Sequence, residues 1–214
     1  NVADDQIEYL GGNFIESAYY NIMHTFKKDN FLYRAMGPGF GVYDMTDPLS
    51  PVTVHEHDYG LELGSPYGIY ADENYIYLCD VQVDKIYIHD NGGSFAQSGV
   101  INDNDTHRAA AHGNYLYTIS ANTWKIYDIT DPANEILVAT HDNMLDLVNG
   151  EMKIYGDYLL LSGGDAGSGT ASVHDISDYQ NIELLLNLDE PLKSFDMDLA
   201  GGKLYVAFGY QAGG

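Results

Sequence analysis

The sequence predicts an all-β protein, a β-propeller built of four-stranded antiparallel blades, and three observations predict it. Two sequence motifs recur at a nearly constant interval along the chain. Each interval contains four short strand signals separated by turns, with no helical pattern between them, which is typical of a propeller blade. The composition suits such a fold, since Tyr and Gly account for 19 and 23 of the 214 residues; aromatic residues favour strands and glycine favours tight turns.

The first motif is a turn followed by an aromatic or bulky residue, an aliphatic residue and usually Tyr. Its aliphatic centres are Leu32, Ile76, Leu116, Leu159 and Leu204. Their spacing gives a repeat of about 40–45 residues, the length of a propeller blade. A β-sandwich also has short, regularly spaced strands, but it would not repeat a motif at this long period.

The second motif is an aliphatic residue, Tyr or His, and then Asp. Its copies are Val42-Tyr43-Asp44, Ile88-His89-Asp90, Ile126-Tyr127-Asp128 and Val173-His174-Asp175. Three copies continue into a polar turn and an aliphatic strand, whereas the turn after Asp90 is rebuilt. We interpret these Asp residues as turn formers that accept backbone hydrogen bonds, not as catalytic groups.

Two segments, Phe40–Pro51 and Trp124–Pro132, resemble the LVIVD repeat, in which an aliphatic run leads into Asp, a hydrophobic residue, Ser or Thr, Asp and Pro. Val173–Asp178 matches in part, and the region of Asp90 matches poorly. The resemblance covers most of residues 22–208. It implies a β-propeller of a bacterial or archaeal surface or secreted protein. It implies no enzymatic activity and supplies no catalytic residues.

The motifs divide the chain into four complete blades and two half-blades. The predicted blades are roughly residues 22–59, 60–104, 105–146 and 147–190, and the half-blades are 1–15 and 191–214. With one gap, Asn1–Leu10 aligns with Asp175–Leu184, so the chain begins at the end of a third strand and supplies a fourth. The half-blades either close a ring within the chain, or the chain is a piece of a longer propeller. A half-blade completed by a neighbouring subunit would give an oligomer or a filament.

The charge balance limits the classes of partner. There are 32 acidic and 9 basic residues, for a formal net charge of −23. Such a surface repels nucleic acid and anionic lipid, so we expect no nucleic-acid partner. No apolar stretch approaches the roughly 18 residues of a membrane span, so we expect no membrane insertion. Together with the family resemblance, this predicts an extracellular or cell-surface protein.

The first strand of each blade lines the central channel of a propeller, where ligands commonly bind. The residues seven positions before the aromatic position of the first motif are His24, Gly68, Arg108, Glu151 and Asp196. We predict that His24, Arg108, Glu151 and Asp196 bind a polar ligand or a cation at the channel mouth. A salt-bridged, water-filled channel without a ligand is the alternative.

No cofactor is required by any motif, and two patterns suggest metals. Asp103 and Asp105 alternate in an acidic loop, and hard oxygen ligands of this kind suit Ca²⁺. The loop lacks the Gly and Glu of an EF-hand, and Asn and Asp also serve turns. His55 and His57 alternate as a metal-binding pair would, without an identifiable third ligand.

The sequence favours a non-enzymatic extracellular propeller that serves binding, adhesion or assembly. Its partner would be a protein, a glycan or a second copy of the chain, and one form of assembly is polymerisation through exchange of half-blades. The alternative is a secreted hydrolase or lyase that acts on polysaccharide at the channel mouth. That function requires the side chains of His24, Arg108, Glu151 or Asp196 to converge on one point.

Overall fold

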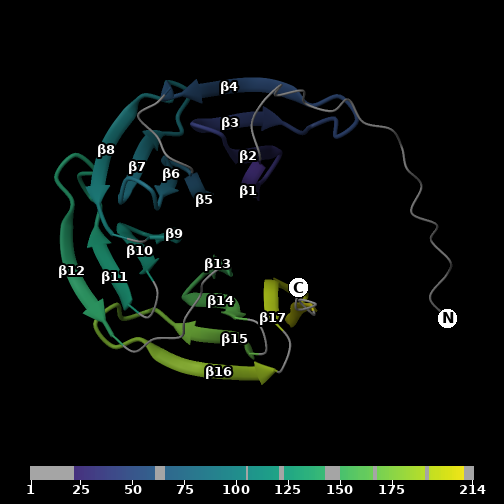
Figure 1. Cartoon of the computed structure of the whole chain (residues 1–214), viewed down its shortest axis with the longest axis vertical. Coiled ribbons are helices and arrows are strands. Elements are labelled where there is room, and N and C mark those ends of the chain that lie inside the picture. The colour runs from purple at the N-terminus through teal and green to yellow at the C-terminus, as the bar shows by residue number, and fades with distance from the viewer. Residues whose placement is uncertain are drawn as a thin grey trace, which may run out of the picture.

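The structure is a computed structural model that describes residues 22–60, 66–104, 106–120, 123–142, 150–165, 168–190 and 193–209. These residues form four four-stranded antiparallel sheets and one two-stranded sheet, arranged around a central axis (Figure 1). The predicted all-β propeller with four four-stranded blades is therefore confirmed. The predicted half-blade at residues 1–15 lies outside the described residues.

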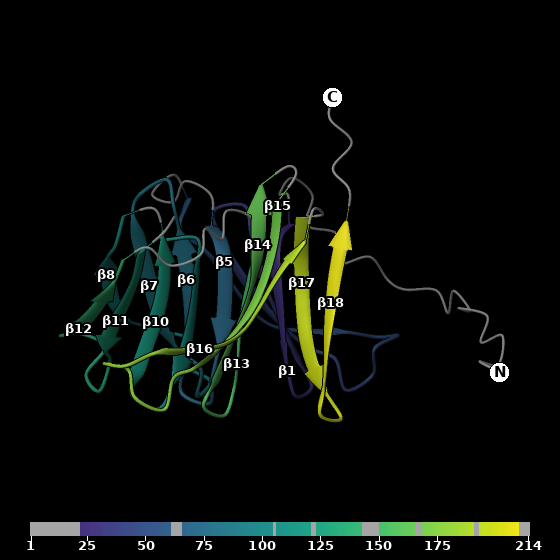
Figure 2. The same ribbon diagram turned by 90° about the horizontal axis from the view of Figure 1, so that it is seen from below.

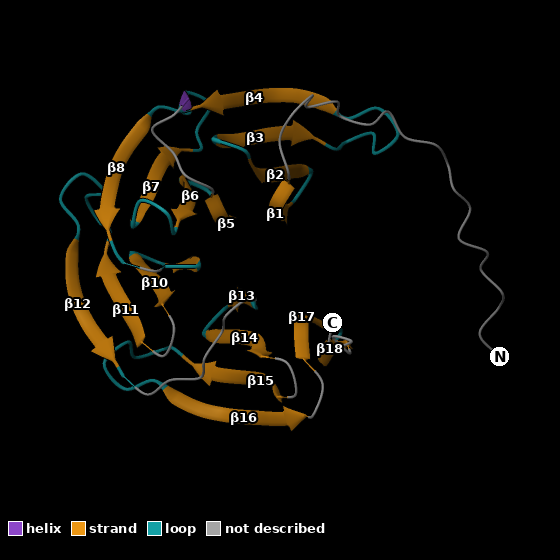
Figure 3. Ribbon diagram, viewed as in Figure 1, coloured by secondary structure: helices purple, strands orange, loops and turns teal. Residues whose placement is uncertain are grey.

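The strands follow one order in every complete blade, from the axis outward (Figure 3). Blade 1 consists of β1 (Ile22–Lys28), β2 (Phe31–Met36), β3 (Gly39–Asp44) and β4 (Val52–Asp58). Blade 2 consists of β5 (Pro66–Ala71), β6 (Tyr75–Asp80), β7 (Lys85–Asp90) and β8 (Gln97–Asn102). Blade 3 consists of β9 (Arg108–His112), β10 (Tyr115–Ser120), β11 (Thr123–Asp128) and β12 (Ile136–His141). Blade 4 consists of β13 (Glu151–Tyr155), β14 (Tyr158–Asp165), β15 (Ser168–Asp175) and β16 (Glu183–Glu190), and the fifth sheet of β17 (Lys193–Ala200) and β18 (Lys203–Gly209).

The second motif marks a β-bulge. The pairing of the third and fourth strands shifts at the same place in each complete blade, namely between Val42 and Tyr43, Ile88 and His89, Ile126 and Tyr127, and Val173 and His174. A bulge increases the local twist of a strand pair. In side view, the rim strand β16 accordingly crosses the inner strands at a large angle (Figure 2).

The Asp that ends the second motif holds the following turn. Asp44, Asp128 and Asp175 each accept a hydrogen bond from the backbone N–H two residues later, at 2.8, 2.9 and 2.9 Å. Asp90 does the same with Gly92 at 3.1 Å in the rebuilt turn. Hydrogen bonds from hydroxyl groups of the same turns (Thr46, Thr130, Ser177 and Ser94), together with these backbone bonds, lower the pKa of all four carboxyl groups. The predicted turn-forming role is confirmed.

The apolar core is divided into clusters between neighbouring sheets. Phe40 and Ile69 belong to the cluster between blades 1 and 2, and Trp124 and Leu159 to the cluster between blades 3 and 4. Cys79 is buried between blades 2 and 3, and burial raises the pKa of its thiol to about 12, so it behaves as a small hydrophobic residue. Among the described residues, no helix has the length and apolar character to cross a membrane.

Candidate functional site

The five residues predicted to line the channel occupy equivalent places in the five sheets. Each lies on the innermost strand and pairs with the residue eleven positions later on the second strand. The pairs are His24–Ala35, Gly68–Cys79, Arg108–Ile119, Glu151–Ser162 and Asp196–Ala207. Because side chains alternate along a strand, equivalent register places these side chains in one layer around the axis.

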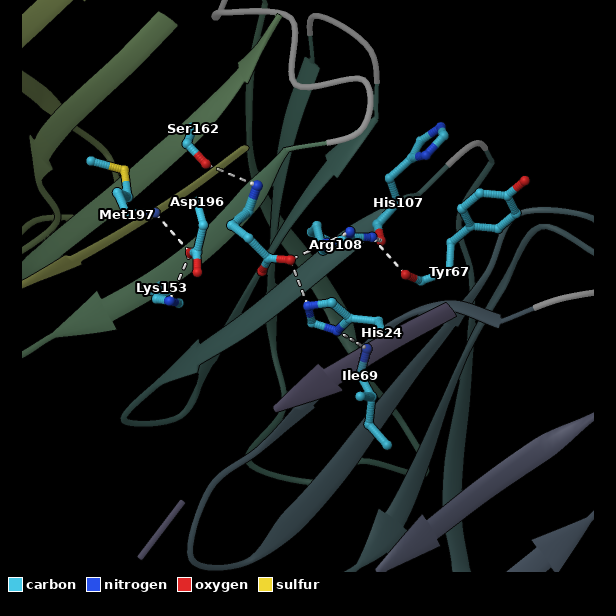
Figure 4. A network of polar contacts seen from close by, with 10 residues as sticks. His24, Tyr67, Ile69, His107, Arg108, Lys153, Ser162, Asp196 and Met197 are labelled. Carbon is cyan, nitrogen blue, oxygen red and sulfur yellow. Dashed lines mark hydrogen bonds and ion pairs between the residues drawn. The ribbon is translucent and has the colours of Figure 1, made fainter. Parts of the chain in front are cut away.

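His24, Arg108 and Glu151 converge although they come from blades 1, 3 and 4 (Figure 4). His24 Nε2 lies 2.6 Å from Glu151 Oε1, and Arg108 Nη2 lies 3.6 Å from the same oxygen. His24 Nδ1 accepts a hydrogen bond from the backbone N–H of Ile69 at 3.1 Å. The ring proton is therefore on Nε2, which donates to the carboxylate.

Two backbone carbonyl oxygens bind the guanidinium group of Arg108. Its Nη1 donates to the carbonyl oxygens of Tyr67 at 2.6 Å and His107 at 2.9 Å. A Cβ at Gly68 would lie 2.5 Å from the His107 oxygen and 3.4 Å from Arg108 Cδ. The absence of a side chain at Gly68 thus allows β9 to approach β5 and leaves room for the guanidinium group.

Asp196 lies beside the triad of His24, Arg108 and Glu151 but has a different partner. Its Oδ1 accepts a hydrogen bond from Lys153 Nζ at 2.8 Å and another from the backbone N–H of Met197 at 2.7 Å (Figure 4). One layer further along the same two strands, Tyr155 donates its hydroxyl to Asp198. The axial layer is therefore two neighbouring groups, the triad and the Lys153–Asp196 pair, and not one ring of four contacts.

Counting back from the first motif does not identify the next layer of residues along the axis. Two residues beyond the predicted positions lie Phe26, Tyr70, Ala110, Lys153 and Asp198. All of these except Ala110 line an axial cavity. The period of two in a β-strand would have identified them, since residues i and i+2 share a face.

An open cavity of about 710 Å³ connects these layers. Its wall is formed by His24, Thr25, Phe26, Lys27, Leu32, Tyr70, Glu151, Lys153, Ile154, Tyr155, Asp196 and Asp198. A second cavity of about 560 Å³ shares Phe26, Lys27, Tyr70 and Ile154 with it. The two together extend the axial space towards the turns after β1, β5 and β9.

Electrostatics favour the ionised form of two carboxyl groups of the cavity, those of Glu151 and Asp198. Burial raises the pKa of Glu151, but the hydrogen bond from His24 and the charges of Arg108 and Lys153 outweigh burial and leave it below its ordinary value. The hydrogen bond from Tyr155 lowers the pKa of Asp198. A general acid that protonates a glycosidic oxygen needs a raised pKa, and neither group has one. The arrangement is suited to binding through fixed charges.

The predicted calcium ligands are only partly described. Asp103 is buried, accepts a hydrogen bond from Thr118 Oγ1 at 2.8 Å and forms an ion pair with Lys125. Asp105 lies outside the described residues. Calcium binding there stays a prediction.

The two histidines of β4 belong to an aromatic cluster at the rim. The ring of His55 stacks on Phe95 at 4.4 Å between centroids, and His57 lies 5.2 Å from the buried ring of His89. His89 Nδ1 donates to the Phe95 carbonyl at 2.9 Å. Among the described residues, no three His, Cys, Asp or Glu side chains are grouped so as to hold a metal ion.

Comparison with known proteins shows the fold alone. No family model and no curated protein sequence matches the chain. Kluyveromyces lactis Hsv2 is similar in structure, with a TM-score of 0.59 and 13% identity over 90% of this chain and 58% of its own. Kuenenia stuttgartiensis hydrazine synthase has a TM-score of 0.61 and 14% identity over 89% of this chain and 55% of its own. The computationally designed Ika4 protein has a TM-score of 0.56 and 15% identity over 74% of this chain and 92% of its own.

This chain therefore spans less than two thirds of the length of the first two proteins. Of the expectations drawn from the LVIVD resemblance, the propeller fold is confirmed.

Proposed function

We propose that the protein is a non-enzymatic extracellular propeller that binds a polar partner, most naturally a glycan, in the axial cavity. The observation that carries the proposal is the cavity of about 710 Å³, whose wall combines aromatic rings with fixed, paired charges. Its volume lies within the range of about 300–1,000 Å³ that is usual for small-ligand sites.

The chemistry of the wall supports a hydroxyl-rich ligand. Phe26, Tyr70 and Tyr155 offer apolar ring surface, and Tyr has a polar end as well. Glu151 and Asp196 offer carboxylate acceptors, and Lys153 offers donors. Because each charge already has a partner, a neutral polar ligand that both donates and accepts hydrogen bonds would meet no unpaired charge.

The acidic composition supports the proposed extracellular or cell-surface location and disfavours anionic partners. With a net charge of −23, the surface would repel nucleic acid and sulfated or phosphorylated polymers at a distance. Neutral glycans and basic proteins would approach without this penalty. Assembly through half-blade exchange remains a second mode of association that this proposal allows.

Calorimetric titration with fragments of neutral and acidic polysaccharides tests the proposal. We expect saturable binding of a neutral fragment, weakened at least tenfold in Glu151→Gln, which is about 1.4 kcal/mol. The matched control is Glu183→Gln on the exposed rim strand β16, which should bind like the parent. Thermal unfolding of both variants checks that the fold is intact.

The alternative is a polysaccharide hydrolase or lyase, which the convergence of His24, Arg108 and Glu151 would suit. Chromatography of the fragments after long incubation separates the two functions. Shortened products that disappear in Glu151→Gln would establish the enzyme. If no fragment is bound or cleaved at millimolar concentration, the proposed glycan site is wrong.

A further inference from the structure

The second axial cavity lies at the end of the propeller where the first strand of each blade turns into the second. Its wall includes residues from three of these turns, namely 72–74 of blade 2, 112–114 of blade 3 and 156 of blade 4. It meets the first cavity at Phe26, Lys27, Tyr70 and Ile154, which line both. The two cavities therefore form one axial space among the innermost strands β1, β5, β9 and β13 (Figure 1).

The triad of His24, Arg108 and Glu151 forms a floor in this space. His24 and Glu151 come from blades 1 and 4, yet His24 Nε2 and Glu151 Oε1 are only 2.6 Å apart (Figure 4). Arg108 of blade 3 approaches the same oxygen at 3.6 Å. A polymer chain cannot pass between atoms at these distances. The triad thus lies at one end of the axial space, and the second cavity forms a mouth at the other.

The distance from the floor to the mouth exceeds the size of one sugar ring. His24 lies at the floor, and Lys28, four residues later on β1, lines the second cavity. A strand rises about 3.3 Å per residue, so these four residues cover about 13 Å. A single pyranose unit in contact with the triad would leave the second cavity unused.

The side chains between floor and mouth suit successive units of a glycan. Phe26 and Tyr70 line both cavities, and their ring centroids lie 4.6 Å apart, so they offer apolar ring surface where the cavities join. Asn74 and Asn114 are exposed on the wall of the second cavity. Their amide groups can both donate and accept hydrogen bonds, as the hydroxyl groups of a sugar require.

Two charged pairs flank the second cavity. Lys28 Nζ lies 2.7 Å from Glu73 Oε1, and His112 Nε2 lies 3.1 Å from Asp157 Oδ1. A charged ligand would have to replace one of these partners, whereas a neutral ligand would leave both pairs intact. The second cavity therefore suits the same class of neutral, hydroxyl-rich ligand as the first.

We propose, on the basis of the proposed function, that the second cavity is a further subsite and that the protein recognises the end of a linear, neutral glycan chain. The terminal unit contacts the triad at the floor. The units that follow lie beside Phe26 and Tyr70 and reach Asn74 and Asn114 at the mouth. The rest of the chain leaves the propeller at the turns, so a polymer holds one protein at such an end and none along its length.

Calorimetric titration with two series of glucose oligomers, β-1,4-linked and α-1,4-linked, tests the subsite. In the series that binds, we expect the affinity to rise about tenfold from the monomer to the trimer, because the trimer adds contacts in the second cavity. A long linear polymer of the same units, titrated in parallel, should bind one protein per chain, as the hexamer does.

Three variants locate the contacts. Asn114→Ala should weaken binding of the trimer about fivefold, the effect of one lost hydrogen bond, and should leave binding of the monomer unchanged. The matched control is Asn30→Ala, since Asn30 occupies the equivalent turn position of blade 1 but lines neither cavity. Glu151→Gln should weaken binding at every length, because the terminal unit contacts the triad. Thermal unfolding checks that each variant is folded.

The outcomes separate this subsite from the proposed function. Equal affinity for monomer and trimer, with both lost in Glu151→Gln, would refute the subsite and leave the glycan site in the first cavity intact. A number of bound proteins that grows with polymer length would show recognition within the chain and would refute recognition of its end. Failure of every oligomer to bind at millimolar concentration would count against the proposed function and the subsite together.

Discussion

The cores between blades and the axial layer follow opposite rules. Between blades, equivalent positions of the first motif keep an aliphatic residue: Ile76, Leu116 and Leu159 are buried in the clusters, and Leu204 packs against one of them. Along the axis, equivalent positions hold His24, Gly68, Arg108, Glu151 and Asp196, no two of them alike. The interfaces between blades resemble one another, so they use similar residues. The axial layer, where the innermost strands of all sheets meet, can hold a different residue in each sheet. The comparison separates residues that maintain the fold from residues that give this propeller its individual site.

The largest expected effect is at a repeated position. Leu116→Ala removes a fully buried side chain between blades and should lower the free energy of unfolding by about 3 kcal/mol, because a cavity remains. Leu137→Ala, at a 51% exposed position of the same blade, should cost less than about 0.5 kcal/mol. Urea unfolding of both variants measures the difference. Equal losses would mean that the inter-blade core does not dominate stability.

A smaller effect is expected at the axis. Arg108→Ala removes the donor to the carbonyl oxygens of Tyr67 and His107 and should destabilise the protein by about 2 kcal/mol. Lys27→Ala, which removes an exposed bond to the Asp29 carbonyl, should cost less than about 0.5 kcal/mol. Unfolding midpoints compare the two. A loss at Arg108 as large as that of Leu116→Ala would place the axial layer among the fold-determining residues.

Acid should weaken the inter-blade contacts at the second motif. Burial lowers the pKa of His89 and His174 to about 4, whereas an unfolded His titrates near 6.5. The unfolded chain therefore binds more protons, and stability that is complete above pH of about 6.5 is lost as pH falls towards 4. His174→Tyr, which introduces the residue found at Tyr43 and Tyr127, should reduce this loss. Urea midpoints between pH 4.5 and 7.5 measure it, and an unchanged slope would contradict the assignment.

The smallest effect is expected for an exposed ion pair between blades. Lys28 Nζ lies 2.7 Å from Glu73 Oε1, and the carboxylate is largely exposed. Lys28→Ala should change stability by less than about 0.5 kcal/mol, because solvent screens such pairs. The difference from the parent should vanish in 1 M salt, where the Debye length is about 3 Å. A difference that persists in salt would indicate a packing role for the lysine stem.

Local sequence patterns were sufficient to predict most of the strands and turns of the fold. The alternation of Tyr75–Tyr77 and the Asp turns identified strands and their ends because these features act between near neighbours in the chain. The bulge beside Val42, Ile88 and their equivalents was not foreseen, since a bulge is visible only when two strands are paired. Counting back from the first motif gives the channel residues. The cavity residues Phe26 and Lys153 follow only when the two-residue period of side chains along a strand is also applied.

By itself, the sequence determined the blade, its length, its turns and the layer in which His24, Arg108, Glu151 and Asp196 lie. Only the tertiary structure decided that three of them meet while Asp196 binds Lys153. The reason is that a strand's side-chain alternation is a local property, readable from spacing. Which charges touch across an axis depends on how strands from different blades are placed relative to one another, and residues 127 positions apart, such as His24 and Glu151, carry no local signal of their contact.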